Sequence, residues 1–253
     1  MLLAADNIHA MNQTVSDALR RLDPEPIREL TLTCVRNGAQ LIDLNPGYLA
    51  PRHEDRMQFL VETVQEATSL RLILDSPNAR VLARGLSACR DTPILNALSL
   101  EPQKIQEILP LAVEYHTDLV LLLMDERSFT PPSTDEKMAL ALELREHALS
   151  AGMNQENLIF DPVLPNLSWE DAYSRIAEDI KTVRLLASGA VLQEPVRTMV
   201  GLSNLRSGHS GLFPAEIDVT CLTLLAGAGL HIALANATNP ALLDVCGMLK
   251  RLI

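Results

Sequence analysis

Aspartate and asparagine residues stand at the ends of the short apolar runs in this sequence. A carboxylate accepts two hydrogen bonds side by side, whereas a carboxamide both donates and accepts. Groups of these two kinds, gathered in one pocket, would suit a neutral ligand with several N–H donors and ring acceptors. From the first run to the last, the residues concerned are Asp6 and Asn7, Asp43 and Asn45, Asp75, Asn96, Asp125, Asp161, Asn204 and Asn236.

Two other interpretations of these residues stay open. Asp and Asn are common turn residues and helix N-caps, so any single one of them could be structural. A metal site built from Asp43, Asp75 and Asp161 is the second alternative, although no HxH or HExxH pattern accompanies these carboxylates. We predict that the chain binds no metal.

The elements that would position these residues follow from the alternation of apolar and amphipathic stretches. Short apolar runs predict strands at 2–5, 39–44, 70–75, 93–97, 118–124, 158–161, 198–202 and 230–235. The amphipathic stretches between them predict helices at roughly 14–37, 54–68, 78–88, 102–116, 134–151, 169–188, 214–228 and 239–251.

Several predicted helix ends carry recognisable signals. Pro102 suits the first turn of its helix. Ser168 suits an N-cap, since acidic residues follow it and favour the positive end of the helix dipole. Gly38, Gly152 and Gly229 each stand between a helix and the next strand, where a helix commonly ends in a glycine.

Eight predicted strands that alternate with eight predicted helices over 253 residues indicate an α/β fold, the (β/α)8 TIM barrel. An open doubly wound sheet is the alternative, but the Gly-rich turn expected after its first strand is missing, and no Walker loop occurs. No linker or repeat divides the chain, so we predict a single domain over 1–253. In such a barrel the chemistry lies at the C-terminal ends of the strands, where the Asp and Asn residues stand.

Composition and charge narrow the class of protein. Hydrophobic residues make up 47% and aromatic residues 3% of the chain, which suits buried parallel strands covered by helices rich in Ala and Leu. The net charge of −11 argues against a nucleic-acid partner, because phosphates need a basic surface.

The sequence also predicts a cytoplasmic protein. No apolar run approaches the roughly 18 residues of a membrane span, and the N-terminus lacks the basic start of a signal peptide. The four cysteines are widely spaced without a CxxC pair, which fits free, buried thiols in a reducing compartment.

Five of the strand ends resemble the methyltetrahydrofolate:corrinoid methyltransferases. This family belongs to the pterin-binding barrel superfamily, which also holds dihydropteroate synthase and the folate module of cobalamin-dependent methionine synthase, and its fold is a (β/α)8 barrel. The matching stretches run in collinear order over nearly the whole chain. They are IDLNPG (42–47), LILDSPN (72–78), NALSLEPQKIQEILPLAVEYHTDLVLLLMDE (96–126), LIFDPVLP (158–165) and VGLSN (200–204).

The resemblance implies how this chain would bind folate. Asp75, Asn96 and Asp161 match the family residues that hold the amino, amide and ring-nitrogen groups of the pterin. Asp43 and Asn45 match the DxN pattern at the second strand end. The 2-amino-4-oxo edge of a pterin presents the donors and acceptors that carboxylates and amides recognise.

The resemblance also implies a catalytic role for Asn204, which matches the asparagine that approaches pterin N5, while Gly201 and Ser203 shape its loop. The methyl group leaves N5, and a tertiary amine is a poor leaving group unless it is protonated or hydrogen-bonded as the bond breaks. A neutral amide can strengthen its hydrogen bond to N5 in the transition state without ionising. A fixed cation would instead oppose protonation of N5.

The activity implied is transfer of a methyl group between N5 of tetrahydrofolate and the cobalt of a corrinoid, with tetrahydrofolate or 5-methyltetrahydrofolate as the substrate. No D-x-H-x-x-G cobalamin-binding pattern occurs in this chain. We therefore expect the corrinoid on a separate protein that docks over the barrel mouth. The resemblance further implies a homodimer.

Two alternative functions stay open. One is a dihydropteroate-synthase-like pterin condensation enzyme, which is disfavoured because Asn204 and Leu205 follow Ser203 where that enzyme has an S-R-K type pattern. The other is a non-catalytic barrel that binds folate or a corrinoid protein. The presence of Asn204 favours catalysis over this alternative, since a scaffold needs no group at N5.

Overall fold

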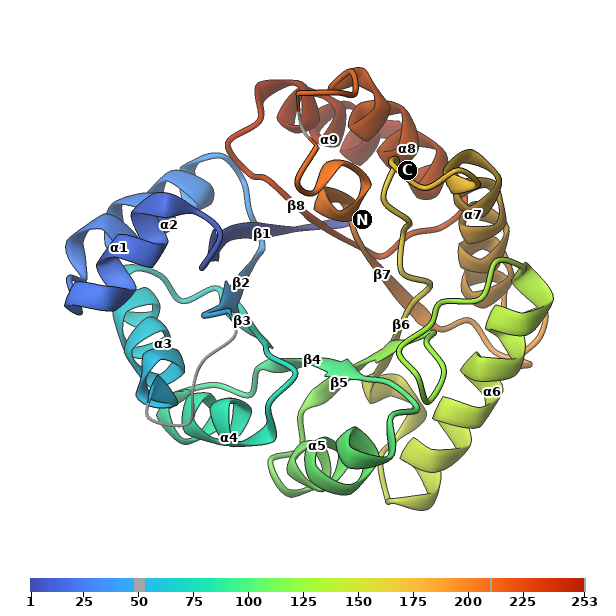
Figure 1. Cartoon of the computed structure of the whole chain (residues 1–253), viewed down its shortest axis with the longest axis horizontal. Helices are drawn as coiled ribbons and strands as arrows, with labels where there is room; N and C mark the ends of the chain where they lie inside the picture. The colour runs from blue at the N-terminus through green and yellow to red at the C-terminus, as the bar shows by residue number, and fades with distance from the viewer. Residues whose placement is uncertain (48–52, 210, 253) are drawn as a thin grey trace.

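Parallel strands close into a barrel at the centre of the molecule (Figure 1). The computed structural model describes residues 1–47, 53–209 and 211–252. Within these ranges each strand pairs in parallel with its neighbours in chain order, and β1 also pairs with β8. The predicted (β/α)8 barrel is therefore confirmed. Its strands are β1 (Leu2–His9), β2 (Leu41–Asn45), β3 (Arg71–Asp75), β4 (Ile94–Leu98), β5 (Asp118–Leu122), β6 (Leu158–Asp161), β7 (Arg197–Gly201) and β8 (Ile232–Ala235).

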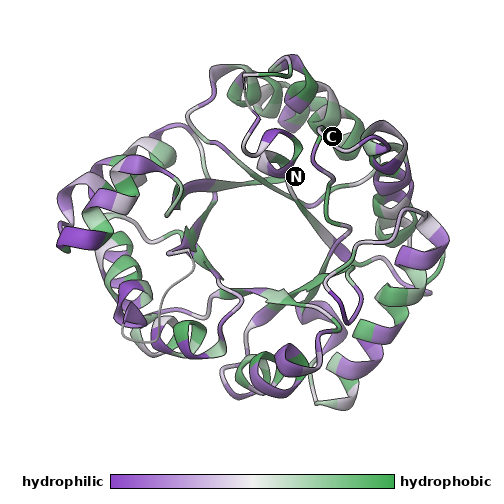
Figure 2. Cartoon of the chain, viewed as in Figure 1, coloured by the Kyte–Doolittle hydropathy of each residue, from purple (hydrophilic) through white to green (hydrophobic). Residues whose placement is uncertain are grey.

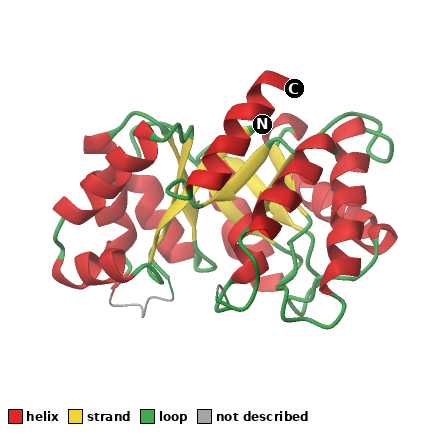
Figure 3. Cartoon of the chain, turned by 90° about the horizontal axis from the view of Figure 1, so that it is seen from above, coloured by secondary structure: helices red, strands yellow, loops and turns green. Residues whose placement is uncertain are grey.

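Helices surround the barrel on all sides, and in the view of Figure 3 they flank the yellow strands. The α-helices are α1 (Gln13–Arg21), α2 (Glu25–Arg36), α3 (Asp55–Ala67), α4 (Ala79–Ala88), α5 (Pro102–Glu114), α6 (Thr134–Ser150), α7 (Ala172–Ser188), α8 (Glu216–Gly227) and α9 (Pro240–Leu252). Two short 3-10 helices, η2 (Gln155–Asn157) and η3 (Leu202–Arg206), lie in the connections. No described helix is both long and apolar enough to cross a membrane.

Two sets of aliphatic side chains make up the core. The outer set lies between the strands and the helices, and the strands and inward helix surfaces are largely hydrophobic in Figure 2. The inner set fills the barrel itself and consists of Ala4, Leu41, Ile73, Ile94, Ala97, Val120, Ile159, Met199, Ile232 and Leu234. Because the interior is packed, a ligand can enter only at one end of the barrel.

The glycines expected at helix ends have the backbone conformation that this position requires. Gly38, Gly152 and Gly229 have φ values of 87°, 101° and 99°, in the left-handed region that residues with a Cβ avoid. Pro102 lies in the first turn of α5, as predicted. These local signals were therefore sufficient to place the ends of four helices.

The single helix predicted over 14–37 is wrong. α1 ends at Arg21, and Leu22 adopts a left-handed conformation with φ of 54°. Pro24 then precedes the first residue of α2, and a proline disfavours the helical conformation in the residue before it. The Asp23-Pro24 pair was the signal in the sequence that two helices meet here.

Ser168 is not the N-cap of α7, contrary to the prediction. Oδ1 of Asn166 accepts a hydrogen bond from the backbone N–H of Ser168 at 3.0 Å, and the backbone oxygen of Asn166 accepts from Trp169. A turn built on Asn166 thus occupies this segment, so α7 begins only at Ala172.

Two predicted strand ends are also wrong. β1 continues to His9 rather than ending at Ala5, because it pairs with β2 again beyond a register shift. Asp6 therefore lies within the strand. β5 ends at Leu122 rather than Met124, since the backbone N–H of Met124 turns back to the oxygen of Leu122 at 2.7 Å.

The cysteines are free, as predicted. Cys34, Cys221 and Cys246 are buried, whereas Cys89 is half-buried. Burial raises the pKa of Cys34, Cys89 and Cys221 to about 11. Thiols of this kind stay protonated at neutral pH and behave as small apolar side chains.

Candidate active site at the barrel mouth

A layer of polar residues closes the packed interior at the C-terminal ends of the strands. Side chains alternate along a strand, so the residue two positions after an interior aliphatic residue also faces inward. These pairs are Ala4 and Asp6, Leu41 and Asp43, Ile73 and Asp75, Ile94 and Asn96, Ile159 and Asp161, and Met199 and Gly201. We call this end of the barrel, with the loops that follow the strands, the mouth.

Three carboxyl groups interact at the centre of the mouth. Asp43 is 2% exposed, and its Oδ1 has no hydrogen-bond partner in the part of the chain that the structure describes. Burial, and then the charges of Asp75 and Asp6, raise the pKa of Asp43 well above its ordinary value. Burial also raises the pKa of Asp6 to about 6, against a hydrogen bond from Ser203 that lowers it. A ligand that donates hydrogen bonds here would satisfy Asp43 and reduce the repulsion.

Asp75, at the end of β3, is held by Asn45 of β2. Nδ2 of Asn45 donates to Oδ2 of Asp75 at 2.7 Å, while Oδ1 of Asn45 accepts from the backbone N–H of Gly47 at 2.9 Å. Burial raises the pKa of Asp75 to about 6, and the Asn45 hydrogen bond and the charge of Lys104 lower it. The second residue of the DxN pattern thus orients a neighbouring carboxylate.

Asn96 lies beside Asp75 on the next strand. The two residues are in register between β3 and β4, and the backbone oxygen of Asn96 accepts a hydrogen bond from Ser76 at 3.0 Å. Asn96 is buried, and the peptide bond between Asn96 and Ala97 is cis. The structure therefore brings these two predicted ligand-binding residues together on one side of the mouth.

Asp161 is buried at the end of β6, two strands along the barrel from Asn96 on β4. Its Oδ1 accepts a hydrogen bond from the backbone N–H of Val163 at 2.7 Å. Val163 has φ of 63°, a conformation that a β-branched residue rarely adopts and that often marks a functional loop. Burial raises the pKa of Asp161 to about 7, the Val163 bond and Lys137 lower it, and Asp75 raises it further.

Asn204 lies in η3, directly after β7, and its side chain folds back over Gly201. A Cβ atom at Gly201 would stand 3.3 Å from Nδ2 of Asn204, so a side chain at this position would displace the amide by a few tenths of an ångström. The backbone oxygen of Asn204 accepts a hydrogen bond from Asn166 at 3.2 Å, and Ser203 bonds to Asp6 of β1. The loop is thus tied to two neighbours while the amide of Asn204 stays exposed.

Other polar residues at strand ends make hydrogen bonds within the protein, of the kind that the alternative interpretation of the sequence allowed. Nδ2 of Asn7 donates to Oδ1 of Asn236 at 2.7 Å and so joins the first and last strands. Asn78 is the N-cap of α4, with a side-chain oxygen that accepts from the backbone. Asp125 accepts two backbone N–H groups of its own loop, each at 2.9 Å.

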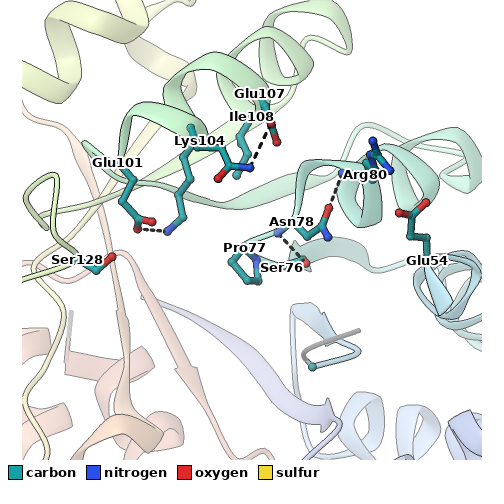
Figure 4. A pocket seen from close by; sticks show the side chains of 12 residues that line it. Glu54, Ser76, Pro77, Asn78, Arg80, Glu101, Lys104, Glu107, Ile108 and Ser128 are labelled. Carbon is teal, nitrogen blue, oxygen red and sulfur yellow. Dashed lines mark hydrogen bonds and ion pairs between the residues drawn. The ribbon is translucent and has the colours of Figure 1, made fainter. Parts of the chain in front are cut away.

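A polar groove of about 590 Å³ lies next to the mouth, between α4 and α5 (Figure 4). In Figure 4 the side chain of Lys104 extends to Glu101, with 2.7 Å between Nζ and Oε1. Nζ of Lys104 also donates to Oγ of Ser99 at 3.2 Å. Because the charge of Lys104 lowers the pKa of Asp75, this groove is electrostatically linked to the mouth.

Three buried charged residues received no role in the site predicted from the sequence. Asp6 was recognised as a strand end but not as a site residue, and Lys137 and Asp179 were not recognised at all. Lys137 of α6 and Asp179 of α7 form an ion pair with exposed fractions of 1% and 0%. Both occupy the buried face of their helix. The other buried residues of α6 are Thr134, Met138, Ala141, Leu144 and Ala148. Those of α7 are Ala172, Ile176, Thr182, Val183 and Leu186. A charge at an otherwise apolar helical position was the signal that could have found them.

The described residues contain no group of three or more His, Cys, Asp or Glu side chains arranged to hold a metal ion. The mouth instead mixes carboxyl groups with the amides of Asn45, Asn96 and Asn204. Such a mixture is suited to an organic ligand that both donates and accepts hydrogen bonds.

The chain is similar in sequence to several known proteins. The sequence matches a family model described as pterin binding enzyme over residues 10–238. It is 22% identical over 243 residues to a methylcorrinoid:tetrahydrofolate methyltransferase from Eubacterium limosum, a match that covers 94% of this chain and 86% of that protein. It is also 22% identical to methionine synthase from Mycobacterium tuberculosis, over 81% of this chain and 17% of that protein.

Solved structures of dihydropteroate synthases share the fold. The Xanthomonas albilineans enzyme with 4-aminobenzoic acid has a TM-score of 0.73 and 17% identity, covering 99% of this chain and 92% of that one. The Yersinia pestis enzyme in complex with a sulfonamide drug has a TM-score of 0.72 and 15% identity, covering 99% and 93%. The family model spans nearly all of the barrel and includes the seven strand ends after β1. The resemblance to pterin-binding barrels is confirmed, and the chain belongs to the pterin binding enzyme family.

Proposed function

We propose that this chain is a methyltransferase that moves a methyl group between N5 of tetrahydrofolate and the cobalt of a corrinoid carried on a separate protein. The observation that carries the proposal is the arrangement of the mouth. Inward-facing Asp75, Asn96 and Asp161 line the strand ends, and the exposed amide of Asn204 folds over Gly201 at the end of β7. The similarity to the Eubacterium limosum methyltransferase supports the same reaction class.

In this proposal Asp75, Asn96 and Asp161 hold the pterin ring. The N–H groups of the pterin donate to the carboxylates, and Asn96 can both donate and accept. Hydrogen bonds to an ionised carboxylate favour that form, so a bound pterin would lower the pKa values that burial has raised at Asp75 and Asp161. Oδ1 of Asp43 is buried and has no hydrogen-bond partner among the described residues, and Asn45 orients Asp75.

Asn204 acts at N5. As the C–N bond breaks, its electron pair stays on N5, which takes up a proton from solvent, and the amide N–H group of Asn204 stabilises the developing electron density without bringing a charge into the site. Gly201 supplies the space for the amide to fold back toward the barrel, and Ser203 ties the loop to Asp6. The residues therefore divide into those that bind the ring and one that assists the reaction.

The corrinoid supplies the cobalt that accepts or donates the methyl group. Because the barrel interior is filled by aliphatic side chains, both substrates must meet at the mouth. A pterin held against the strand ends would leave the outer side of the mouth for the corrinoid, so we propose that its carrier protein docks there. The homodimer and the cytoplasmic location expected from the sequence form part of this proposal.

The direct test is methyl transfer from 5-methyltetrahydrofolate to free Co(I) cobalamin, followed by the loss of the Co(I) absorbance. We expect transfer that depends on the protein and is abolished in the Asp75→Ala and Asp161→Ala variants. Each of these variants should also weaken folate binding by about 1–3 kcal/mol, since pterin donors are left unpaired. Folate affinity that is unchanged in both folded variants would refute the pterin assignment.

Two parallel measurements separate the alternatives. Condensation of a pterin pyrophosphate with 4-aminobenzoate, in the absence of methyl transfer, would establish the dihydropteroate-synthase-like function. Folate binding without either reaction, tested also with a corrinoid protein as acceptor, would establish a non-catalytic barrel. We expect neither outcome, because Asn204 and Leu205 follow Ser203 in place of a lysine, and Asn204 reaches back over Gly201.

A further inference from the structure

The buried ion pair between Lys137 and Asp179 lies beside the strand that carries Asp161. α6 precedes β6 and α7 follows it, and Figure 1 shows the two helices side by side outside this strand. Lys137 is in the first turns of α6, and a helix of this fold begins at the mouth. Asp161, the last residue of β6, stands at the same end of the barrel.

The pair is closed off from solvent. Nζ of Lys137 donates a hydrogen bond to Oδ1 of Asp179, and the exposed fractions of the two side chains are 1% and 0%. Oδ2 of Asp179 has no hydrogen-bond partner among the described residues. Burying two charges is costly, and well-packed apolar residues at such positions are often equally stable. Stability alone therefore gives no reason for a charged pair here.

Asp161 is the third charged member of this cluster. Besides burial and the Val163 hydrogen bond, the charges that act on the pKa of Asp161 are Lys137, which lowers it, and Asp75, which raises it. Burial raises the pKa of Asp179 to about 7, Lys137 and Arg175 lower it, and Asp161 raises it. The charge of Lys137 thus acts on two buried carboxyl groups, that of Asp179, to which it is hydrogen-bonded, and that of Asp161 at the end of β6.

We propose that Lys137 and Asp179 are positioning residues of the mouth, which present Asp161 to a bound pterin as a hydrogen-bond acceptor. This inference rests on the proposed function, because it takes Asp161 to accept N–H groups of the ring. Without the cation, Asp161 would keep its proton beside Asp75 and offer an O–H group to ring atoms that are themselves donors. Asp179 accepts a hydrogen bond from Lys137 and so fixes the position of its amino group where water cannot reach it.

The test compares the pH dependence of 5-methyltetrahydrofolate binding in the wild type and in the Lys137→Met variant from pH 5.5 to 9. Binding by the wild type should improve as Asp161 ionises, with a midpoint near the pKa of about 7 in the free protein. In Lys137→Met the midpoint should rise by about one pH unit, the lower end of the effect expected for a neighbouring opposite charge. Affinity at pH 7 should then fall about fivefold and recover toward the wild-type value at pH 9.

A second variant keeps the test valid if an unpaired Asp179 destabilises the fold. Lys137→Met combined with Asp179→Leu removes both charges and leaves an apolar pair, which should fold. This double variant still lacks the cation, so its binding midpoint should also be raised. Lys181→Met is the matched control, since Lys181 is on α7 in an exposed ion pair with Glu178 and should leave the profile unchanged.

Carbon-13 NMR titration of the Asp161 carboxyl group in the free protein supplies a readout that needs no ligand. We expect the titration of Asp161 to move to higher pH in both Lys137 variants. If a folded Lys137 variant kept the Asp161 titration curve and the pH profile of binding found in the wild type, the inference would be overturned. A loss of folate affinity that is equal at every pH would also overturn it. Full folate affinity in Asp161→Asn would instead refute the pterin role of Asp161, so failure of the proposed function is recognised separately.

Discussion

The side-chain amide of Asn45 donates a hydrogen bond to the carboxylate of Asp75 across two neighbouring strand ends, with 2.7 Å between Nδ2 and Oδ2. The oxygen of the same amide accepts the backbone N–H of Gly47, so both ends of Asn45 are engaged. This bond orients Asp75 and lowers its pKa against the effect of burial. Asn45 is therefore a support for the carboxylate that is expected to meet the ligand.

Replacing Asn45 by alanine should make folate binding more sensitive to pH. Asp75 loses the donor that favours its ionised form, so its pKa rises from about 6 and the carboxylate is available only at higher pH. We expect about a tenfold loss of affinity at pH 6 and a smaller loss at pH 8, measured by calorimetry. An equal loss at both pH values would show that Asn45 acts on the ligand directly.

Replacing Asn204 by alanine should slow methyl transfer more than it weakens folate binding. In the proposed reaction the hydrogen bond from the amide to N5 is strongest when the C–N bond breaks, so its loss should affect the transition state more than the ground state. Removal of one such donor typically costs about 10²–10³-fold in rate. Single-turnover transfer, folate affinity and the melting temperature should be measured together. Parallel losses of rate, affinity and stability would instead assign Asn204 to the structure of η3.

The Gly201→Ala variant should disturb the same amide without removing it. The added Cβ would stand 3.3 Å from Nδ2 of Asn204, so the exposed Asn204 side chain must shift by a few tenths of an ångström. We expect transfer to slow by roughly 3- to 10-fold, because small displacements of a catalytic group reduce the rate. Thermal unfolding should remain close to that of the wild type. A full transfer rate with a lowered melting temperature would contradict this prediction.

The Asp161→Asn variant should be more stable than the wild type at alkaline pH although it binds folate less well. Burial raises the pKa of Asp161 from its ordinary value of 3.8 to about 7, so the folded state holds a proton that the unfolded state has lost between these values. The stability of the wild type therefore falls as pH rises through this range. Asparagine has no such proton, and its oxygen can still accept the N–H of Val163.

Urea unfolding at pH 4 and pH 8 would check this prediction. The free energy of unfolding of Asp161→Asn should exceed that of the wild type by on the order of 1–3 kcal/mol at pH 8, and the difference should shrink toward zero at pH 4. Destabilisation that grows with pH would show that the ionised carboxylate stabilises the free protein. A gain in stability with a loss of binding would be a trade-off of the kind found at functional sites.

The alternation of short apolar runs with amphipathic stretches was sufficient to predict the closed barrel and its polar mouth. The two-residue period of a strand and the ends of helices are local properties, and the neighbours of each residue along the chain record them. Asp75, Asn96 and Asp161 could therefore be located at strand ends before their positions in space were known. The division of 14–37 into two helices was equally local, since Pro24 marks it.

Which polar groups interact was decided only by closure of the barrel. Asn45 and Asp75 are 30 positions apart, and Lys137 and Asp179 are 42 apart, so no local pattern relates them. The register between parallel strands and the packing of α6 beside α7 bring these atoms together and shut out water. Exclusion of water is what raises the pKa values of the buried carboxyl groups, and it is a property of the tertiary structure. The residue types at the mouth are thus a matter of sequence, while their partners and their charge states depend on the folded barrel.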